Sequence, residues 1–531
     1  MPMKIQVKQL NGTVDEVEVM PAVTIREFKW QLKDLLPARR VSTVELILGL
    51  NKLTDESKTV EEAGISDGSE VQVLFRAIDP VECSHGQDVC RVKPGRISSL
   101  LAVKIPISVT EIQRHAFWNC RALMKVDIPD SVTSIGPGAF RYCSSLVEVT
   151  LPNSVTVIGD EAFKDCRSLP EVMIPTSVTY IGESAFKRCC SLTALTIPDS
   201  TTFIGGGAFN ECRSLREFTI PESMTRIERA CFQNCRSLKR LTIPNSVTHI
   251  DCSAFESCRS LTEVTLSKSV KHIGDFAFKK CTSLMALRIP DSVTCIGVEA
   301  FSTCSCLVEL IIPDAVTSLG ASACYDCASL VEVKVPKTMM RIEDGFLQNC
   351  SSLMKFTIPD SVTLIGVGAF SYCSMLKELS IPDCVTHIGD HAFKNCGSLL
   401  ELAIPNSVTF IGDCAFKNCS SLAKLIIPNS LKGIGDYVFH FCTSLTEVTI
   451  PTSVTHIGDS AFKSCKSLKR LTLPNSVTHI GKSAFCDCTS LETTLPDSIR
   501  HIGEDAFAGT KTSVAGLPKR RRLAKASDSN R

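Results

Sequence analysis

The sequence predicts an α/β protein in which a strand-rich solenoid of about 18 coils, each of about 23 residues, follows a small N-terminal domain. Three observations support this fold class. Cys recurs every 23 residues from Cys120 to Cys488, and Leu keeps the same interval from Leu123 to Leu491. Residues 3–75 lack the repeat. We therefore divide the chain into an N-terminal domain (1–76), a linker or cap (77–99), the solenoid (100–510) and a basic tail (511–531).

Composition excludes several classes of protein. Lys+Arg 57 against Asp+Glu 56 leaves a net charge of +1, so we expect no nucleic-acid partner, although a local basic patch is compatible with this balance. Hydrophobic residues make up 44% of the chain, enough for a packed core. No apolar run is long enough for a membrane span, and the charged N-terminus has no signal-peptide core. We therefore expect a cytoplasmic protein with free thiols.

Each coil of the solenoid reads as two short strands and a closing turn. In residues 444–466, "LTEVTIP" is a strand-forming run ended by Pro, and "SVTHIG" is a second run ended by Gly. "DSAFKSC" has room for one helical turn. The predicted inward side chains are Leu445, Val448, Ile450, Val454, Ile457, Ala461, Phe462 and Cys465. One coil cannot bury these alone, so stability must come from stacking.

The repeat resembles the BspA-like leucine-rich repeat, because Leu, Pro, Ile-Gly, Ala-Phe and Cys recur in register over most of the chain. The resemblance implies a leucine-rich-repeat solenoid that binds proteins or serves in adhesion, and no catalysis or cofactor. Cys324 and Leu347 replace the repeated Phe, and Glu228 and Glu343 replace the repeated Gly. These departures predict local irregularity within the same fold.

The N-terminal domain reads as a hairpin, a helix and further strands. Two alternating runs flank Asn11-Gly12, a strong hairpin signal. Ile25, Phe28, Leu32 and Leu36 have helical spacing, and "VELILGLNKL" and "SEVQVLF" predict strands. This order is similar to the ubiquitin-like β-grasp domain. The terminal Gly-Gly tail of that family is absent, so the resemblance implies a fixed fusion module.

Two regions outside the solenoid carry candidate interaction sites. In ubiquitin-like folds an apolar patch recruits partners, and the matching positions here are Leu10, Ile47 and Leu74. The resemblance implies components of the ubiquitin–proteasome system as partners. The alternative is that these three positions are ordinary, partly buried strand residues with no role in binding. A basic cluster in the tail is compatible with nuclear import or with a solubilising role: Lys519, Arg520, Arg521 and Arg522.

The Cys and His columns allow either chemistry or packing. A single file of thiols does not converge as zinc ligands do, so we expect the repeated Cys to pack in the core. Disulfides are the alternative under oxidising conditions, with Cys190, Cys306 and Cys486 the most redox-sensitive. Six His share one position, where we expect them to face solvent: His249, His272, His387, His456, His479 and His501. We predict neither a metal site nor a catalytic constellation.

A second column is acidic and forms the best candidate for a partner-binding surface. Two residues after the repeated Leu come Glu148, Glu171, Glu217, Glu263, Glu309, Glu332, Glu378, Glu401 and Glu447. Lys125, Arg240, Lys355, Lys424 and Arg470 interrupt the column and relieve repulsion between like charges. The alternative is an ordinary solvated face.

The sequence as a whole predicts a non-enzymatic scaffold. The solenoid would bind a protein partner, and the N-terminal domain would recruit a second factor. The alternative is a surface or secreted adhesion protein, the role familiar in the repeat family. Fold alone does not decide between these functions.

Overall fold

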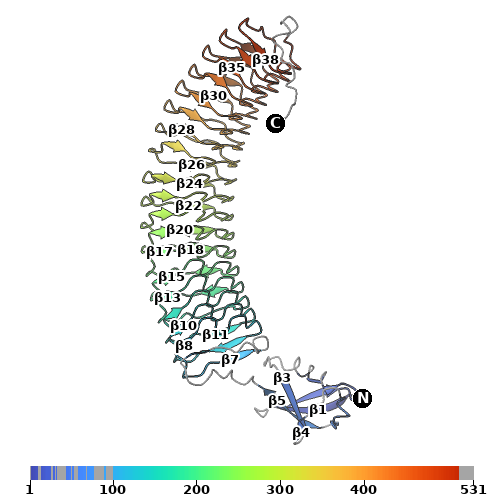
Figure 1. Ribbon diagram of the computed structural model, residues 1–531. Helices are drawn as coiled ribbons and strands as arrows, with labels where there is room; N and C mark the ends of the chain where they lie inside the picture. Colours follow the sequence, from blue (N-terminus) through green and yellow to red (C-terminus); the bar gives the residue numbers. More distant parts are fainter. Residues whose placement is uncertain are drawn as a thin grey trace, which may run out of the picture.

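The computed structural model describes residues 2–9, 14–25, 28–29, 32, 43–48, 51–52, 58–66, 69–76, 89–90 and 100–512 (Figure 1). The predicted turn at Asn11-Gly12, Leu36 and most of the linker lie outside these residues. No helix in the described part of the chain has the length and apolar content needed to cross a bilayer.

The N-terminal domain contains a five-stranded mixed sheet in the order β2-β1-β5-β3-β4. Its strands are β1 (Met3–Gln9), β2 (Val14–Val19), β3 (Thr43–Leu48), β4 (Asn51–Lys52) and β5 (Glu70–Arg76). The predicted hairpin is confirmed, since β1 and β2 pair antiparallel from Met3↔Val19 onward. Ile25, Phe28 and Leu32 are helical and buried, as their spacing predicts. The ubiquitin-like identity of the domain stays a prediction.

Most coils of the solenoid contribute two strands. The first-strand column comprises β7 (Ala102–Lys104), β9 (Lys125–Asp127), β11 (Glu148–Thr150), β14 (Ala194–Leu195), β16 (Glu217–Phe218), β18 (Arg240–Thr242), β20 (Glu263–Thr265), β22 (Ala286–Arg288), β24 (Glu309–Ile311), β26 (Glu332–Lys334), β30 (Glu401–Ala403), β32 (Lys424–Ile426), β34 (Glu447–Thr449) and β36 (Arg470–Thr472).

The second-strand column runs the whole length of the solenoid. It comprises β6 (Val89–Cys90), β8 (Glu111–Ile112), β10 (Ser134–Ile135), β12 (Val157–Ile158), β13 (Tyr180–Ile181), β15 (Phe203–Ile204), β17 (Arg226–Ile227), β19 (His249–Ile250), β21 (His272–Ile273), β23 (Cys295–Ile296), β25 (Ser318–Leu319), β27 (Arg341–Ile342), β28 (Leu364–Ile365), β29 (His387–Ile388), β31 (Phe410–Ile411), β33 (Gly433–Ile434), β35 (His456–Ile457), β37 (His479–Ile480) and β38 (His501–Ile502). β6, from the predicted linker, pairs with β8.

The coils stack into an elongated, curved body with one continuous core (Figure 1). All eight inward side chains predicted for residues 444–466 are buried. The Phe rings of successive coils stack face to face, for example Phe232 on Phe255 with ring centres 5.4 Å apart. The predicted strand-rich solenoid is therefore confirmed, and its interior is a column of identical layers.

The helical turn predicted at the end of each coil is absent from the coils described. Residues 136–143, for example, form successive turns in which Gly138 and Tyr142 have positive φ angles of 62° and 66°. Two such left-handed residues, four apart, recur in nearly every coil. They break the helical path and aim alternate N–H groups along the solenoid axis, where the next coil accepts them.

This turn edge, formed by the residues between the repeated Gly and Cys, joins every pair of neighbouring coils. In the second complete coil Gly138, Phe140 and Tyr142 donate their N–H groups to carbonyls of the next coil at 2.7–2.8 Å. The same three bonds recur without interruption up to the bonds from Ser483, Phe485 and Asp487. The turn edge is therefore the uninterrupted hydrogen-bonded seam of the molecule.

The second-strand column, by contrast, breaks into separate sheets at three places. Pairing is lost between β15 and β17, between β25 and β27, and between β31 and β33. The first two breaks fall at Glu228 and Glu343, where the departures from Ile-Gly predict irregularity. A Cβ on the equivalent Gly205 would lie 2.5 Å from Glu183 N, so the coils approach too closely there for a side chain. Asp251 also replaces this Gly, yet its N–H still bonds Ile227 O at 2.9 Å.

A better correlate of the three breaks is the inward side chain two residues before the second strand, which is buried at Met224 and Leu431 and half-buried at Met339. Most coils have Val here, but the three coils that lose their pairing have Met224, Met339 and Leu431. Thr201, close to Val in size, leaves the pairing of its coil intact. Ile499, as large as Leu431, also leaves the pairing of its coil intact, so the three breaks coincide with side chains that are not β-branched.

The Phe column is interrupted where Cys324 and Leu347 replace Phe. The first of these two coils holds the small pair Ala323-Cys324, whereas the second holds the large pair Phe346-Leu347. All four side chains are fully buried. The larger side chain of Phe346 thus compensates for the small side chains of the preceding coil, and the total side-chain volume of the core stays nearly constant.

Candidate functional site

The nine predicted Glu lie on one exposed face, formed by the outward side chains of the first-strand column and the residues just before each strand. We call this the first-strand face. Strands there alternate exposed and buried positions: in β11, Glu148 and Thr150 are exposed and Val149 is buried. In-register parallel pairing sets equivalent side chains of neighbouring coils beside each other, as for Glu309↔Glu332. All nine Glu are exposed, as predicted; their role in binding stays a prediction.

Basic residues relieve the acidic column at specific places. Lys125 bonds Glu148 on the next coil at 2.6 Å, and Lys424 bonds Glu401 on the preceding coil at 2.8 Å. The hydrogen bond with Glu148 raises the pKa of Lys125. These exposed pairs contribute little stability, typically below about 1 kcal/mol each. Their main effect is to divide the face into regions of different charge.

Exposed apolar side chains on this face were not predicted from the sequence. Met285, Val308 and Ile311 stand on three neighbouring positions around β22 and β24, and Leu400 and Ile426 stand around β30 and β32. Met285 is 57% exposed and Ile426 is 64% exposed. The available signal was the two outward positions that flank the Glu column, one residue before it and two residues after it, because both vary between apolar and polar residues. Apolar groups among charges are typical of surfaces that bind proteins.

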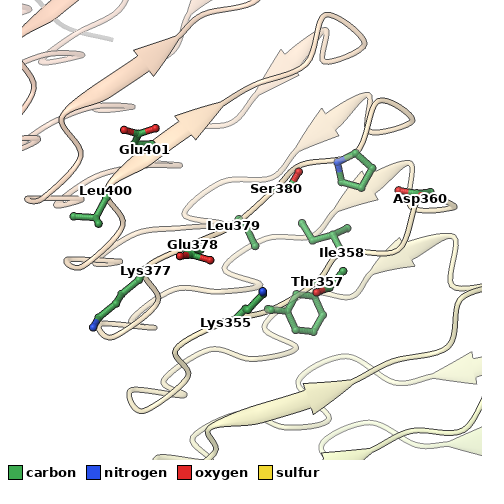
Figure 2. Close-up of a pocket in the computed structure, with 12 residues that line it drawn as sticks. Lys355, Thr357, Ile358, Asp360, Lys377, Glu378, Leu379, Ser380, Leu400 and Glu401 are labelled. Atoms are coloured by element: carbon green, nitrogen blue, oxygen red, sulfur yellow. The ribbon is translucent and has the colours of Figure 1, made fainter.

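A groove opens where the first-strand ladder is reduced to a single bridge, Lys355↔Glu378. Its volume is about 590 Å³. Figure 2 shows that its lining comes from three successive coils. Phe356, buried, contributes to the lining, and Leu400 and Glu401 stand on the third coil. The groove therefore combines apolar surface with charges of both signs, within the first-strand face.

The repeated Cys are core residues, as predicted. All of them from Cys120 to Cys488 are fully buried and free. From Cys143 onward each Sγ donates to the carbonyl of the residue at the Phe position in the preceding coil, for example Cys258 to Phe232 O at 3.2 Å. Burial raises the pKa of the Cys258 thiol to about 12. These thiols therefore act as small hydrogen-bonding core groups and are poor nucleophiles.

Side chains that could bind a metal do not converge in the described part of the chain. No group of three or more His, Cys, Asp or Glu among those residues has metal-binding geometry. Cys306 is exposed, whereas Cys190 and Cys486 are half-buried; Cys384, exposed, was overlooked.

The repeated His face outward as predicted, each next to a buried Ile. His249 and His272 stack with ring centres 4.7 Å apart. Burial, followed by the nearby His272, lowers the pKa of His249. The six side chains thus form part of the solvated surface of the second-strand column.

The predicted sites outside the solenoid fall largely beyond the described residues. Leu10 and the tail cluster Lys519, Arg520, Arg521 and Arg522 are outside them. Ile47 lies in β3 opposite Gln72, and Leu74 lies in β5 opposite Glu45. The side chains of Ile47 and Leu74 are not described, so the apolar patch stays a prediction.

The chain matches the BspA type leucine rich repeat region over residues 96–190, 179–308, 294–423 and 411–520. A leucine-rich repeat protein from Bacteroides ovatus is 27% identical, with 81% of this chain and 96% of that chain covered and a TM-score of 0.45. A leucine rich cell surface protein from Faecalibacterium prausnitzii is 27% identical, with 75% and 88% covered and a TM-score of 0.31.

A ubiquitin from Caldiarchaeum subterraneum is 22% identical, with 15% of this chain and 99% of that chain covered and a TM-score of 0.14. No curated protein matches the chain. The family match spans most of the sequence and the whole solenoid. The chain therefore belongs to the BspA-type leucine-rich-repeat family, whose solenoid is a protein-interaction scaffold fold.

Proposed function

We propose that this protein is a non-enzymatic adaptor whose solenoid binds a protein partner through the first-strand face. The observation that carries the proposal is the combination on that face of exposed apolar side chains and regularly spaced charges. Met285, Val308 and Ile311 lie among Glu309 and Glu332 there. Such a mixture offers both apolar burial and charge complementarity to a partner.

The N-terminal domain is proposed to recruit a second factor, from the ubiquitin–proteasome system, in the cytoplasm or nucleus. Its five-stranded mixed sheet, with β1 and β5 parallel at the centre, supports a ubiquitin-like assignment. The patch Leu10, Ile47 and Leu74 would form the contact, and the basic tail would direct nuclear import. If polar substitution of these three residues leaves every partner of the domain bound, the recruiting role is wrong.

Affinity capture with the full chain tests the proposed binding face. A variant with Glu309→Arg and Glu332→Arg should lose the solenoid's partner, because two charges on the face are reversed. The matched control, Glu183→Arg and Glu222→Arg, makes the same change at exposed positions outside the face and should retain it. Retention by both variants, or loss by both, would contradict binding through the first-strand face.

Adhesion outside the cell is the second candidate, and membership of the BspA-type family favours it. In that setting the exposed thiols of Cys306 and Cys384 would be oxidised, whereas a reducing compartment keeps them free. Mass spectrometry of the native protein after rapid alkylation separates the two functions. Free thiols at Cys306 and Cys384 in protein from the cell interior would exclude the adhesive role.

A further inference from the structure

One part of the first-strand face is strongly basic and, together with the turns that lead into it, spans three consecutive coils. Its exposed cations are Arg216, Arg236, Lys239, Arg240 and Arg259. We call these residues the basic band. Backbone bonds place the coils side by side: Lys239 N donates to Arg216 O at 3.2 Å, and Ser260 N donates to Arg236 O at 3.2 Å. Successive coils here are about 5 Å apart, the distance between neighbouring parallel strands.

The charges of the basic band have no counter-ions in the described part of the chain. Elsewhere on the face Lys125, Lys334 and Lys424 each pair with a carboxylate. None of the five cations of the band makes such a pair, although Arg240 stands directly beside Glu263 in the strand register. Neighbouring unpaired cations repel one another in the free protein, and an anionic partner would remove that repulsion.

Two carboxylates restrict what kind of anion the band can accept. Glu217 and Glu263 are exposed on the strands before and after Arg240. A uniformly anionic chain, such as a nucleic acid or a sulfated glycan, would be repelled by both. A protein segment can set acidic side chains on the cations and neutral or basic ones on the two Glu. Arg also suits carboxylate and phosphate groups, since its guanidinium forms paired hydrogen bonds with them.

We propose that the basic band binds an acidic segment of a protein partner, rich in Asp, Glu or phosphoserine. This rests on the proposed function of the first-strand face and specifies the chemistry of its partner. It also divides the face by charge, because the acidic and apolar region around β24 and β26 suits basic residues of a partner instead. One partner lying along the solenoid would meet both regions in a fixed order.

The chain supplies a matched control for testing this site. Residues 465–480 repeat the sequence of residues 235–250 with only Arg/Lys and Ile/Leu exchanges, so Lys466, Lys469 and Arg470 correspond to Arg236, Lys239 and Arg240. These three cations are also exposed and unpaired, but the adjoining coils hold Thr443, Thr446 and Thr489 in place of further cations. Substitution of these three residues removes the same number of charges from a coil whose neighbours carry no cations at the equivalent positions.

The experiment is fluorescence anisotropy with the full-length protein and a short labelled peptide of Glu, Asp, Ser and Gly. The variant Arg236→Ala, Lys239→Ala, Arg240→Ala should bind the peptide roughly tenfold more weakly than the wild type, given the modest strength of exposed ion pairs. The variant Lys466→Ala, Lys469→Ala, Arg470→Ala should stay within about twofold. Wild-type binding should weaken as salt rises. All substitutions are at exposed positions, and circular dichroism checks the fold.

Three results would overturn the proposal: no peptide binding by the wild type, equal weakening in both variants, or tighter binding of oligothymidylate or heparin fragments than of the peptide. The proposed function would survive each of them if the Glu309→Arg, Glu332→Arg variant still loses its partner in affinity capture. If that variant keeps its partner in affinity capture, partner binding through the first-strand face as a whole is refuted.

Discussion

The turn edge and the first-strand face belong to the same coils but differ in how continuously backbone hydrogen bonds join one coil to the next. Along the turn edge, three backbone hydrogen bonds join each coil to the next from His115 to Asp487 without a gap. The first-strand column instead falls into sheets of three, two, five and four strands, with isolated bridges at Glu171↔Ala194 and Lys355↔Glu378 between them. The turns therefore hold the stack together, although strands are the usual source of inter-coil bonding.

This difference separates stability from recognition. The inward side chains at the turn edge, such as Phe255 and the adjoining Cys258, are fully buried and vary little between coils. Side chains of the first-strand face are exposed and vary between acidic, basic and apolar. A face that contributes little to stacking can accumulate such changes, because exposed substitutions rarely cost more than about 0.5 kcal/mol.

The largest expected effect comes from breaking the Phe column. Phe255→Ala removes a ring stacked between Phe232 and Phe278, and should lower the free energy of unfolding by about 3–5 kcal/mol. Glu263→Ala, on the exposed strand of the same coil, should change it by less than about 0.5 kcal/mol. Urea unfolding monitored by circular dichroism measures both. Similar losses in the two variants would refute the division between edge and face.

The buried thiols of the turn edge should make the protein sensitive to alkali. Burial raises the pKa of Cys258, Cys327, Cys373 and Cys419 to about 12, whereas an unfolded thiol has a pKa of about 8.5. Above about pH 8.5 the unfolded chain loses protons that the folded chain keeps, so stability falls by up to about 1.4 kcal/mol per pH unit for each such thiol.

Unfolding free energies measured from neutral to alkaline pH test this slope. Cys258→Ala should lower stability at neutral pH, through loss of packing and of the bond to Phe232 O. It should also reduce the fall of the unfolding free energy with rising pH by the contribution of one thiol. An unchanged slope in this variant would mean that the repeated Cys do not cause the pH dependence.

Thiol labelling should distinguish the face and loops from the turn edge at single residues. Cys306 and Cys384 are exposed and should react first with iodoacetamide, while the repeated Cys react only when coils open. Half-buried Cys190, whose pKa burial raises, should be intermediate. Peptide mass spectrometry over time gives the order. Early labelling of Cys258 would contradict a closed turn edge.

The smallest effect concerns the breaks in the second-strand column. The amides of Thr248 and Thr363 bond the preceding coil at 2.9 and 2.8 Å, whereas no such bond holds Thr225 or Met340. Hydrogen exchange at Thr225 and Met340 should therefore be faster by about tenfold or more. Met339→Val should slow exchange at Met340 if the Met339 side chain causes the break. Exchange unaffected by this change would assign the break to Glu343 instead.

Periodicity predicted most of the solenoid because each inward position recurs with the same residue type. The inward set of residues 444–466 was predicted correctly from recurrence in register, and the outward His from alternation with the neighbouring Ile. The turn edge was misread, since Asp-Ser before Ala-Phe resembles a helix start. Its left-handed residues include Tyr142 and Phe276, which carry no signal for positive φ.

The binding face was only partly predictable for a related reason. The sequence shows the Glu column directly, but the pairing partners of charges depend on which coils stay in register. Between β26 and β30, for example, the first-strand ladder is reduced to the single bridge Lys355↔Glu378. The unpaired state of the basic band likewise follows from three-dimensional neighbours, which no single coil reveals.

The seam of main-chain bonds along the turns has a consequence for how the gene can change. Its donors and acceptors are backbone atoms with equivalent partners in every coil, so adding or deleting one 23-residue unit would join the flanking layers without altering their contacts. Unequal recombination within the coding region can then lengthen or shorten the protein in whole steps. Each new copy would begin as a duplicate surface, free to diverge toward a different ligand.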